Sequence, residues 1–217
     1  MKKILSDHER SRLDQLIADA EKRTNAQIVL AVIKRSDDYT ELPWKAFALS
    51  ASVAGLFVVI LDFILNYWVS HTTVLIAAVV MLSTGAAFAL LTIFIPGFAR
   101  IFLSAHRAKV EVKQYAESLF LNRELFATRK RIGILLLVSL FERQVILLPD
   151  KGLKSRLTMD AMQDIIACMM QPLVHNELNR ALENGLEELS KTLESSTQVT
   201  GNNENELSDQ IIEEKGV

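Results

Sequence analysis

The sequence has a single cysteine, Cys168, so no disulfide can form within the chain. This excludes a disulfide-stabilised secreted scaffold and fits a reducing compartment. The chain also lacks an excess of either charge, because its formal net charge is −2, and a strongly basic nucleic-acid-binding protein is excluded. In contrast, 50% of its 217 residues are hydrophobic and the mean hydropathy is +0.21. A chain with this composition is not disordered, and part of it is apolar enough for lipid.

Established catalytic signatures are absent from the sequence, including G-x-G-x-x-G, the P-loop, H-E-x-x-H and G-x-S-x-G. Val174 stands where a cysteine phosphatase of the C-x5-R type would need arginine after Cys168. The four histidines lie in separate segments without the i, i+4 spacing of a zinc site. We therefore expect them to be surface or cap residues. They are His8, His71, His106 and His175. No catalytic residue is assigned.

Two long apolar runs follow one another in the first half of the chain. The first covers residues 46–69 with Asp62 as its one charge, and the second covers residues 72–94 without charge. Each exceeds the about 20 residues that a helix needs to cross a bilayer. Only two residues separate the runs, so they predict a transmembrane helical hairpin within residues 44–97 that crosses the lipid bilayer and returns.

Lysine and arginine flank this hairpin and are absent from its connecting turn. Because cytoplasmic flanks of membrane helices are rich in these residues, both flanks are predicted to be cytosolic. The N-terminal segment turns polar at Ser6 and lacks the apolar region of a signal peptide. We therefore expect a cytoplasmic (inner) membrane protein with two spans, whose termini and soluble part face the cytosol. The flanking basic residues are Lys34, Arg35, Lys45, Arg100, Arg107, Lys109 and Lys113.

The rest of the chain alternates helical and strand patterns on both sides of the hairpin. A capping box at Ser6 and Glu9 predicts a helix that ends near Thr24. The unbroken apolar run 27–33 predicts a strand covered on both faces. After the hairpin, residues 106–121 have helical spacing, and this order is typical of an α/β fold.

The second half continues with two strands and two helices. Residues 132–141 and 144–148 predict a β-hairpin with a two-residue turn at Glu142 and Arg143. Thr158 is positioned to cap a helix that runs through Met170, and Pro172 is suited to the first turn of the next helix. That helix presents leucines at core spacing. They are Leu178, Leu182, Leu186, Leu189 and Leu193.

The domain organisation follows from this order. Residues 6–37 and 106–194 together form one discontinuous cytosolic α/β domain that the hairpin interrupts. Residues 195–217 are polar and acidic, with one short apolar element around Leu207, Ile211 and Ile212. Such a segment is typical of a disordered tail.

Three stretches resemble the TPM domain family. They are residues 24–29 (TNAQIV), residues 125–135 (LFATRKRIGIL) and residues 138–148 (VSLFERQVILL). The likeness is greatest to the bacterial membrane branch, whose members carry a transmembrane hairpin between the first strand and the second helix. It departs from the family at Gln27, where Glu is frequent, and at Phe141, where a small residue is common. The resemblance implies an α/β fold with a small sheet covered by helices on both faces and interrupted by an inserted two-helix transmembrane hairpin.

Two charged clusters in the soluble part are candidate binding sites. Arg129, Lys130 and Arg131 precede the central strand, and they suit a phosphate or lipid headgroup or are a solvated strand entrance. Asp160 and Asp164 share one face of a predicted helix just after Asp150, and together these three carboxylates are able to hold Ca²⁺ or Mg²⁺. Acids in the first turn also complement a helix dipole without any metal.

Asp62 is the third candidate, because a charge within a membrane span is costly and often functional. It lies in the second half of the first span, nearer the outer interface.

Two functions remain open at this point. The first is a membrane-tethered interaction or accessory module that assists assembly, maintenance or regulation of another membrane protein, whose identity the sequence does not give. The second is a metal-dependent phosphatase acting on phosphomonoesters, since relatives with the TPM domain are linked to acid phosphatase activity as well as to photosystem maintenance and to an auxiliary role beside a receptor channel. No cofactor is expected for the module, whereas the phosphatase implies Ca²⁺ or Mg²⁺. No nucleic-acid partner is expected in either case.

Overall fold

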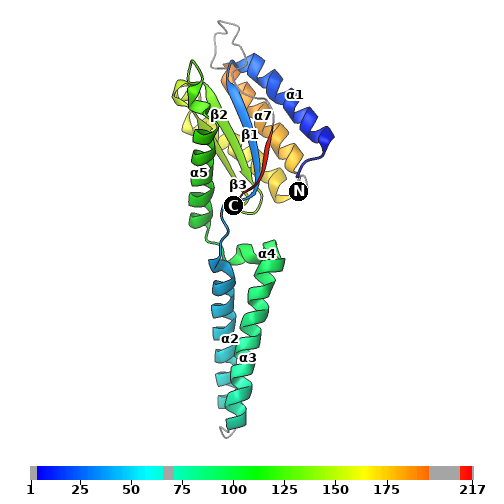
Figure 1. The fold of residues 1–217 in the computed structure, drawn as a ribbon, viewed down its shortest axis with the longest axis vertical. Coiled ribbons are helices and arrows are strands. Elements are labelled where there is room, and N and C mark those ends of the chain that lie inside the picture. Colours follow the sequence, from blue (N-terminus) through cyan, green and yellow to red (C-terminus); the bar gives the residue numbers. More distant parts are fainter. Residues whose placement is uncertain (1–3, 66–70, 196–210, 217) are drawn as a thin grey trace. The chain divides into compact units, whose positions relative to one another are not determined.

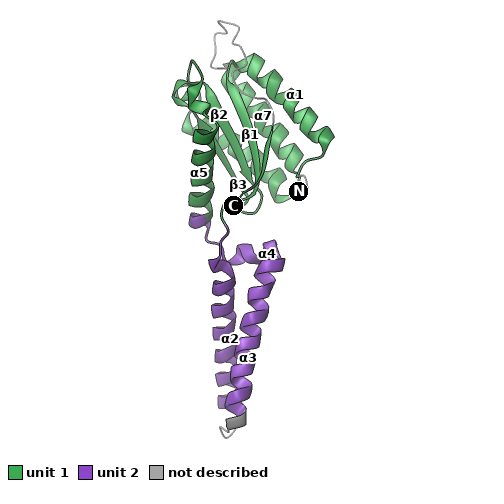
Figure 2. Cartoon of the chain, viewed as in Figure 1, with its two compact units in different colours: residues 1–37, 108–217 green, residues 38–107 purple. Residues whose placement is uncertain are grey.

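The computed structural model describes residues 4–65, 71–195 and 211–216, and the chain divides into two compact units (Figure 2). The first unit combines residues 1–37 with residues 108–217, and the second comprises residues 38–107. The chain thus enters the first unit, leaves it for the second and then returns.

A four-stranded mixed sheet forms the centre of the first unit (Figure 1). Its strands lie in the order β3-β2-β1-β4. The inner strand β1 runs parallel to both of its neighbours, whereas β2 and β3 are antiparallel. The strands are β1 (Gln27–Arg35), β2 (Gly133–Ser139), β3 (Gln144–Pro149) and β4 (Ile212–Gly216). The predicted α/β class is confirmed.

Helices cover both faces of this sheet. Alternate residues of a strand point to opposite faces, so Leu30 packs toward one core and Ala31 toward the other. The first core is formed with α1 (Asp7–Thr24), α6 (Met159–Val174) and α7 (Leu178–Ser195), and the second with α5 (Ala105–Asn122). Short 3-10 turns at Leu125–Ala127 and Lys151–Leu153 connect the elements.

Local signals in the sequence define the ends of α1 as expected. Ser6 Oγ accepts from the backbone N–H of Glu9 at 3.3 Å, and Glu9 accepts from the N–H of Ser6 at 2.8 Å. These bonds satisfy two backbone donors that the first helical turn leaves without partners, and hydrogen bonding to Ser6 lowers the pKa of Glu9. At the other end Asn25 adopts the left-handed conformation, with φ 55°, which terminates the helix.

The turn between β2 and β3 is longer than predicted. β2 ends at Ser139, so the turn contains four residues from Leu140 to Arg143. The prediction of a two-residue turn is wrong. The buried side chain of Glu142 forms hydrogen bonds with Ser36 and Ser139, and these bonds hold residues 140–143 out of the strand ladder. Arg143 completes the turn with φ 52°.

Pro172 occupies a different place from the one predicted. The structure continues α6 to Val174, so this proline lies in the last turn of α6 and not in the first turn of α7. A proline removes one backbone donor from a helix. The helix ends two residues later, at Val174, and the side chain of Pro172 is buried.

The acidic tail also differs from the sequence expectation where the structure describes it. Residues 196–210 and 217, for which disorder was predicted, lie outside the described residues. Ile212–Gly216, in contrast, forms the strand β4 along the edge of β1. The prediction of disorder is wrong for these residues because β1 supplies backbone partners that the tail sequence cannot reveal.

The second unit contains two long apolar helices, α2 (Glu41–Leu65) and α3 (His71–Phe94), followed by the short helix α4 (Pro96–Ala99) and a 3-10 turn at Arg100–Phe102. The helices α2 and α3 are long and apolar enough to cross a membrane, over Glu41–Ile64 and Thr73–Phe94. Within the most apolar 18 residues of each helix, only 11% of α2 and 6% of α3 is buried within the protein.

Small residues let α2 and α3 approach closely. A Cβ added at Gly85 would lie 2.8 Å from the ring of Phe47, and one at Gly55 would lie 3.2 Å from Met81. The two helices therefore pack as a hairpin, as expected. The predicted first span extends through Val69, and its last residues, 66–69, lie outside the described part of the chain.

Candidate functional site

Arg131, from the predicted basic cluster, and Asp150, from the predicted acidic cluster, form an ion pair with two contacts. Arg131 Nη2 lies 3.0 Å from Asp150 Oδ1, and Arg131 Nε lies 2.8 Å from Asp150 Oδ2. Asp150 is 5% exposed, and its Oδ1 also accepts from the backbone N–H of Lys151 at 2.7 Å. Both carboxylate oxygens are thus engaged within the protein.

The turn that carries Arg131 is fixed by close backbone packing. A Cβ added at Gly152 would meet the carbonyl oxygens of Lys130 at 2.4 Å and Arg131 at 2.6 Å. Thr128 Oγ1 accepts from the backbone N–H of Ile132 at 3.0 Å. Arg131 itself has φ 56°, a conformation that non-glycine residues seldom adopt. The turn is therefore closely packed, and it presents Arg131 to Asp150.

The two other residues of the basic cluster, Arg129 and Lys130, are exposed on the same turn. The guanidinium of Arg131 lies 5.9 Å from the ring centroid of Phe126, within reach of a cation–π contact. Of the three, Arg129 and Lys130 present basic groups at the surface, while Arg131 is committed to Asp150. Binding of a phosphate or lipid headgroup at this turn stays a prediction.

The structure does not bring Asp150, Asp160 and Asp164 together as a metal site. Asp160 and Asp164 are exposed on α6, and Asp150 is held by Arg131. Within residues 4–65, 71–195 and 211–216, no group of three or more His, Cys, Asp or Glu is placed to hold a metal ion. The positions of the three acids therefore do not fit the Ca²⁺ or Mg²⁺ that a metal-dependent phosphatase would need.

Asp62 lies in α2 and is partly exposed near the end of that helix. A functional role for Asp62 stays a prediction.

A buried hydroxyl and carboxylate cluster lies where β1 and β2 end, and the search for site residues in the sequence missed it. Glu142 Oε1 accepts from the backbone N–H of Ser36 at 2.8 Å and from its hydroxyl at 2.7 Å. The other oxygen, Oε2, accepts from the Ser139 hydroxyl. All three residues are buried. Carboxyl ends of adjacent parallel strands are the usual place for ligand sites in α/β sheets.

The signal that could have found this cluster is the spacing S-x-x-E at Ser139 and Glu142, which lies within one of the TPM-like stretches. The third member, Ser36, is 106 positions away from Glu142. Only the parallel pairing of β1 with β2 brings it there, because Ile33 stands opposite Ser139. The sequence alone contains no local pattern that predicts this contact.

A pocket of about 230 Å³ lies beside this cluster. Arg143 and Asn176 are polar residues of its lining, together with Leu140, Leu173 and Leu178. Ser139 lines it as well but is 0% exposed. Since the hydroxyl is covered and bonded to Glu142, it is not available to attack a molecule in the pocket. The cluster therefore acts as a structural polar core in the conformation observed.

Cys168 has the properties of a structural thiol. Its Sγ donates to the backbone carbonyl of Ile165 at 3.0 Å, and burial raises the pKa of the thiol. A raised pKa lowers the fraction of the reactive thiolate. Cys168 is therefore a poor nucleophile at neutral pH.

The comparisons with known proteins bear on the fold. Residues 100–192 match the family model of the TPM domain, TPM_phosphatase. This TPM match covers α5, β2, β3, α6 and most of α7, and it contains both Arg131–Asp150 and Ser139–Glu142. No curated protein matches the chain.

A solved structure resembles the chain over nearly all of its length. It is the NMR structure of the BA42 protein from the psychrophilic bacterium Bizionia argentinensis, with a TM-score of 0.59 and 14% sequence identity. The likeness covers 99% of this chain and 98% of the other. At this identity it shows a shared fold, and it extends the structural likeness beyond the TPM match to α1 and β1.

Proposed function

We propose that this protein is a membrane-anchored interaction module that assists assembly, maintenance or regulation of another membrane protein. The observation that carries the proposal is the exposure of the apolar side chains on α2 and α3. Phe63 is 86% exposed and Phe94 is 76% exposed. Surfaces this apolar are not stable in water and indicate contact with lipid or with another protein.

Charged side chains at the end of the hairpin where the chain enters and leaves support the membrane assignment. Glu41 Oε1 lies 3.8 Å from Lys45 Nζ and 3.1 Å from Arg107 Nε. The Lys45 and Arg107 side chains are partly exposed, and cations in this position suit the lipid–water interface, where they remain hydrated. The basic residues Lys45, Arg100 and Arg107 favour the cytosolic side of the membrane for this end of the hairpin.

The proposed module function also agrees with the state of the charged groups in the soluble unit. Arg131 is paired with Asp150, and Glu142 is bonded to two serines. Transfer of a phosphoryl group needs a positioned cation or arginine clamp together with a nucleophile or base. In the described residues these particular groups instead hold turns and strand ends together.

A pull-down in mild detergent with mass spectrometry tests the module. The full chain should retain a membrane protein in stoichiometric amount, reproducibly across detergents. An unrelated two-span membrane protein purified in the same way removes proteins that bind any micelle. Absence of a reproducible partner across several detergents and growth conditions would argue strongly against the module.

The second candidate function is phosphomonoester hydrolysis, favoured by the match of residues 100–192 to TPM_phosphatase. It predicts that the purified chain with Mg²⁺ or Ca²⁺ hydrolyses a generic phosphomonoester. Arg129→Ala should then lower the activity well beyond any effect on stability. Activity that persists undiminished in Arg129→Ala and in Asp160→Ala would argue against a phosphoryl site built from the predicted residues and would indicate a contaminating enzyme.

The proposed orientation has its own test by cysteine labelling. In a Cys168→Ser background, a membrane-impermeant thiol reagent should label Ser70→Cys from outside intact cells. Ser195→Cys, at the C-terminal end of α7, should react only after the cells are permeabilised. Labelling of position 195 from outside would overturn the cytosolic placement.

A further inference from the structure

The C-terminal strand β4 is held at the edge of the sheet by side chains from both of its faces. Ile211 and Glu213 point toward the α1 side, whereas Ile212 and Glu214 point toward the α5 side, as the alternation of a strand requires. The contacts come from residues about 90 to 210 positions away in the sequence. The edge therefore has specific contacts for each of these four positions.

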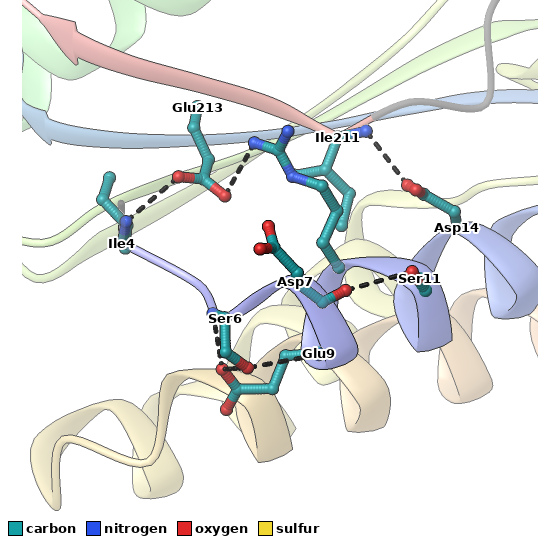
Figure 3. Close-up of polar contacts among 9 residues, drawn as sticks. Ile4, Ser6, Asp7, Glu9, Ser11, Asp14, Ile211 and Glu213 are labelled. Atoms are coloured by element: carbon teal, nitrogen blue, oxygen red, sulfur yellow. Dashed lines mark hydrogen bonds and ion pairs between the residues drawn. The ribbon is translucent and has the colours of Figure 1, made fainter. Parts of the chain in front are cut away.

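On the α1 side the contacts are made by a backbone donor and two charged groups (Figure 3). Glu213 Oε2 accepts from the backbone N–H of Ile4 at 3.0 Å, and Arg10 Nη2 lies 2.8 Å from Glu213 Oε1. Asp14 Oδ1 accepts from the backbone N–H of Ile211 at 3.2 Å. Ile211 itself is 4% exposed and belongs to the first core, which α1, α6 and α7 form with the sheet. This side thus recognises an apolar residue and, two positions later, a carboxylate.

On the α5 side a second carboxylate is bound. The Tyr115 hydroxyl donates to Glu214 Oε2 at 2.6 Å, and Arg123 Nη2 lies 3.1 Å from Glu214 Oε1. Ile212 packs against the second core, which α5 forms with the sheet. An extended segment with two apolar residues followed by two acids therefore matches both sides of the edge.

The backbone of β1 adds a further requirement. Ala31 stands opposite Ile212 and Arg35 opposite Gly216 in a parallel ladder. Gly216 has φ +78°, and a Cβ there would lie 1.6 Å from the carbonyl oxygen of Arg35. Only glycine is compatible with that position. The edge accepts a segment of the pattern Ile-Ile-Glu-Glu-x-Gly.

An edge strand whose donors and acceptors are unpaired is a ready template for another strand. Without β4, the outer side of β1 between Ala31 and Arg35 would be such an edge. β4 has only five residues, and sixteen residues, 196–211, join it to the end of α7. A stretch of this length spans up to about 50 Å when extended, so β4 is able to leave the edge without unfolding α7.

We propose that the outer edge of β1 is a strand-acceptor site for an extended acidic segment of a partner protein, and that β4 occupies this site while the partner is absent. This deepens the proposed module function, on which it rests, by naming how the partner is recognised. The complementary charge of Arg10 and Arg123 selects an acidic strand, and the apolar cores select the residues before the acids. The chain's own tail competes with the partner for the same backbone groups.

The test uses the full chain in detergent, with a site-specific protease site placed in residues 198–204. The chain folds with its tail attached and is cut afterwards, so that folding does not depend on the truncated form. The probe is a fluorescent peptide of residues 207–217, measured by anisotropy. The cut chain should bind the probe after its own tail has been washed away, and the uncut chain should bind at least about tenfold more weakly because the tethered tail competes.

Matched peptides distinguish a specific strand site from general stickiness. A peptide with Glu213→Lys and Glu214→Lys should lose at least about tenfold in affinity relative to the parent peptide. A peptide with Gly216→Ala should bind no better than this charge-reversed peptide. Binding of the charge-reversed peptide should return in a cut chain that carries Arg10→Glu and Arg123→Glu. Equal binding of all the peptides, or no binding by a cut chain that remains folded, would overturn the strand-acceptor site.

Two further readouts separate this proposal from its rivals. If the tails exchange between copies, the uncut chain will form dimers of doubled mass in detergent, and the partner would then be a second copy and the proposal wrong. Peptide binding needs no membrane partner, so its failure is distinct from a failed pull-down. When the module function holds, the cut and washed chain should capture more of the membrane partner than the uncut chain does.

Discussion

Arg131 and Asp150 meet through two parallel contacts, although nineteen positions separate them in the sequence. Arg131 comes just before β2 and Asp150 just after β3, and the antiparallel register, with Ile134 opposite Pro149, places the two ends side by side. Two charges that the sequence assigned to different sites thus form one structural pair.

This pair predicts an asymmetric response to mutation. Arg131→Gln leaves the buried carboxylate of Asp150 without its cation and should destabilise the protein by about 2–4 kcal/mol. Asp150→Asn leaves a half-exposed arginine that water can solvate, so its cost should be smaller. Lys154→Gln, which replaces an exposed cation four residues after Asp150, is the control and should change stability by less than about 0.5 kcal/mol. Urea unfolding measures all three, and equal effects of Arg131→Gln and Lys154→Gln would contradict the pairing.

Much of the fold could be predicted from local patterns, because those patterns act within a few residues. The capping box at Ser6 and Glu9 and the apolar run of β1 depend only on their neighbours along the chain. The same holds for the length and hydropathy of α2 and α3. α1, β1 and α3 therefore appear close to their predicted bounds, whereas α2 begins at Glu41, five residues before the predicted span.

Contacts that depend on sheet register could not be predicted in the same way. Ser36 reaches Glu142 only because β1 and β2 are parallel neighbours. The acidic pattern of β4 resembles a disordered tail, and its strand conformation depends on Arg10, Tyr115 and Arg123. For the candidate site, the sequence places Arg131 before one strand and Asp150 after another, but only the antiparallel register of β2 and β3 shows that these two residues pair with each other.

Arg156 supports a second prediction, because it links the ends of two helices. Its Nη2 donates to the carbonyl oxygen of Thr24 at 3.1 Å and to that of Leu193 at 2.9 Å. Burial lowers the pKa of this guanidinium, but arginine stays charged, and a cation at helix C-terminal carbonyls is favourable.

Arg156→Met removes both bonds and should destabilise the protein by about 2–3 kcal/mol. Arg156→Lys keeps the charge and should recover part of the loss. Thermal unfolding followed by circular dichroism gives the comparison. A neutral effect of Arg156→Met would show that these two bonds do not contribute to stability.

The Tyr115 hydroxyl supports a third prediction, which concerns pH. Burial raises the pKa of Tyr115, and its bond to Glu214 raises it further. Since the folded-state pKa lies above the ordinary value of about 10, the stabilisation is complete below pH 10 and is lost as the pH rises through the folded-state pKa. The difference in stability between the parent chain and Tyr115→Phe should therefore shrink above pH 10.

Phenolate absorbance provides the direct measurement. The signal that Tyr115→Phe removes should titrate above the ordinary range in the parent chain, and Glu214→Gln should move it back toward that range. Cutting and washing away the tail should have a similar effect, because it removes Glu214 and uncovers the phenol. An unshifted signal in the parent chain would show that Tyr115 is not bonded to the tail.

The last prediction concerns whether the soluble unit needs the hairpin to fold. β1 lies before the hairpin in sequence and β2 after it, yet the two strands pair over seven positions, from Gln27 with Gly133 to Ile33 with Ser139. The cores on both faces of this sheet are formed by residues outside 38–107. Replacing Trp44 to Pro96 with a short Gly/Ser linker should therefore leave every core contact of the first unit in place. We expect a soluble α/β protein that unfolds cooperatively on heating and no longer associates with membranes. A product with helical circular dichroism but no cooperative transition would show that the apolar helices are needed for the fold, and that the hairpin is more than an insertion.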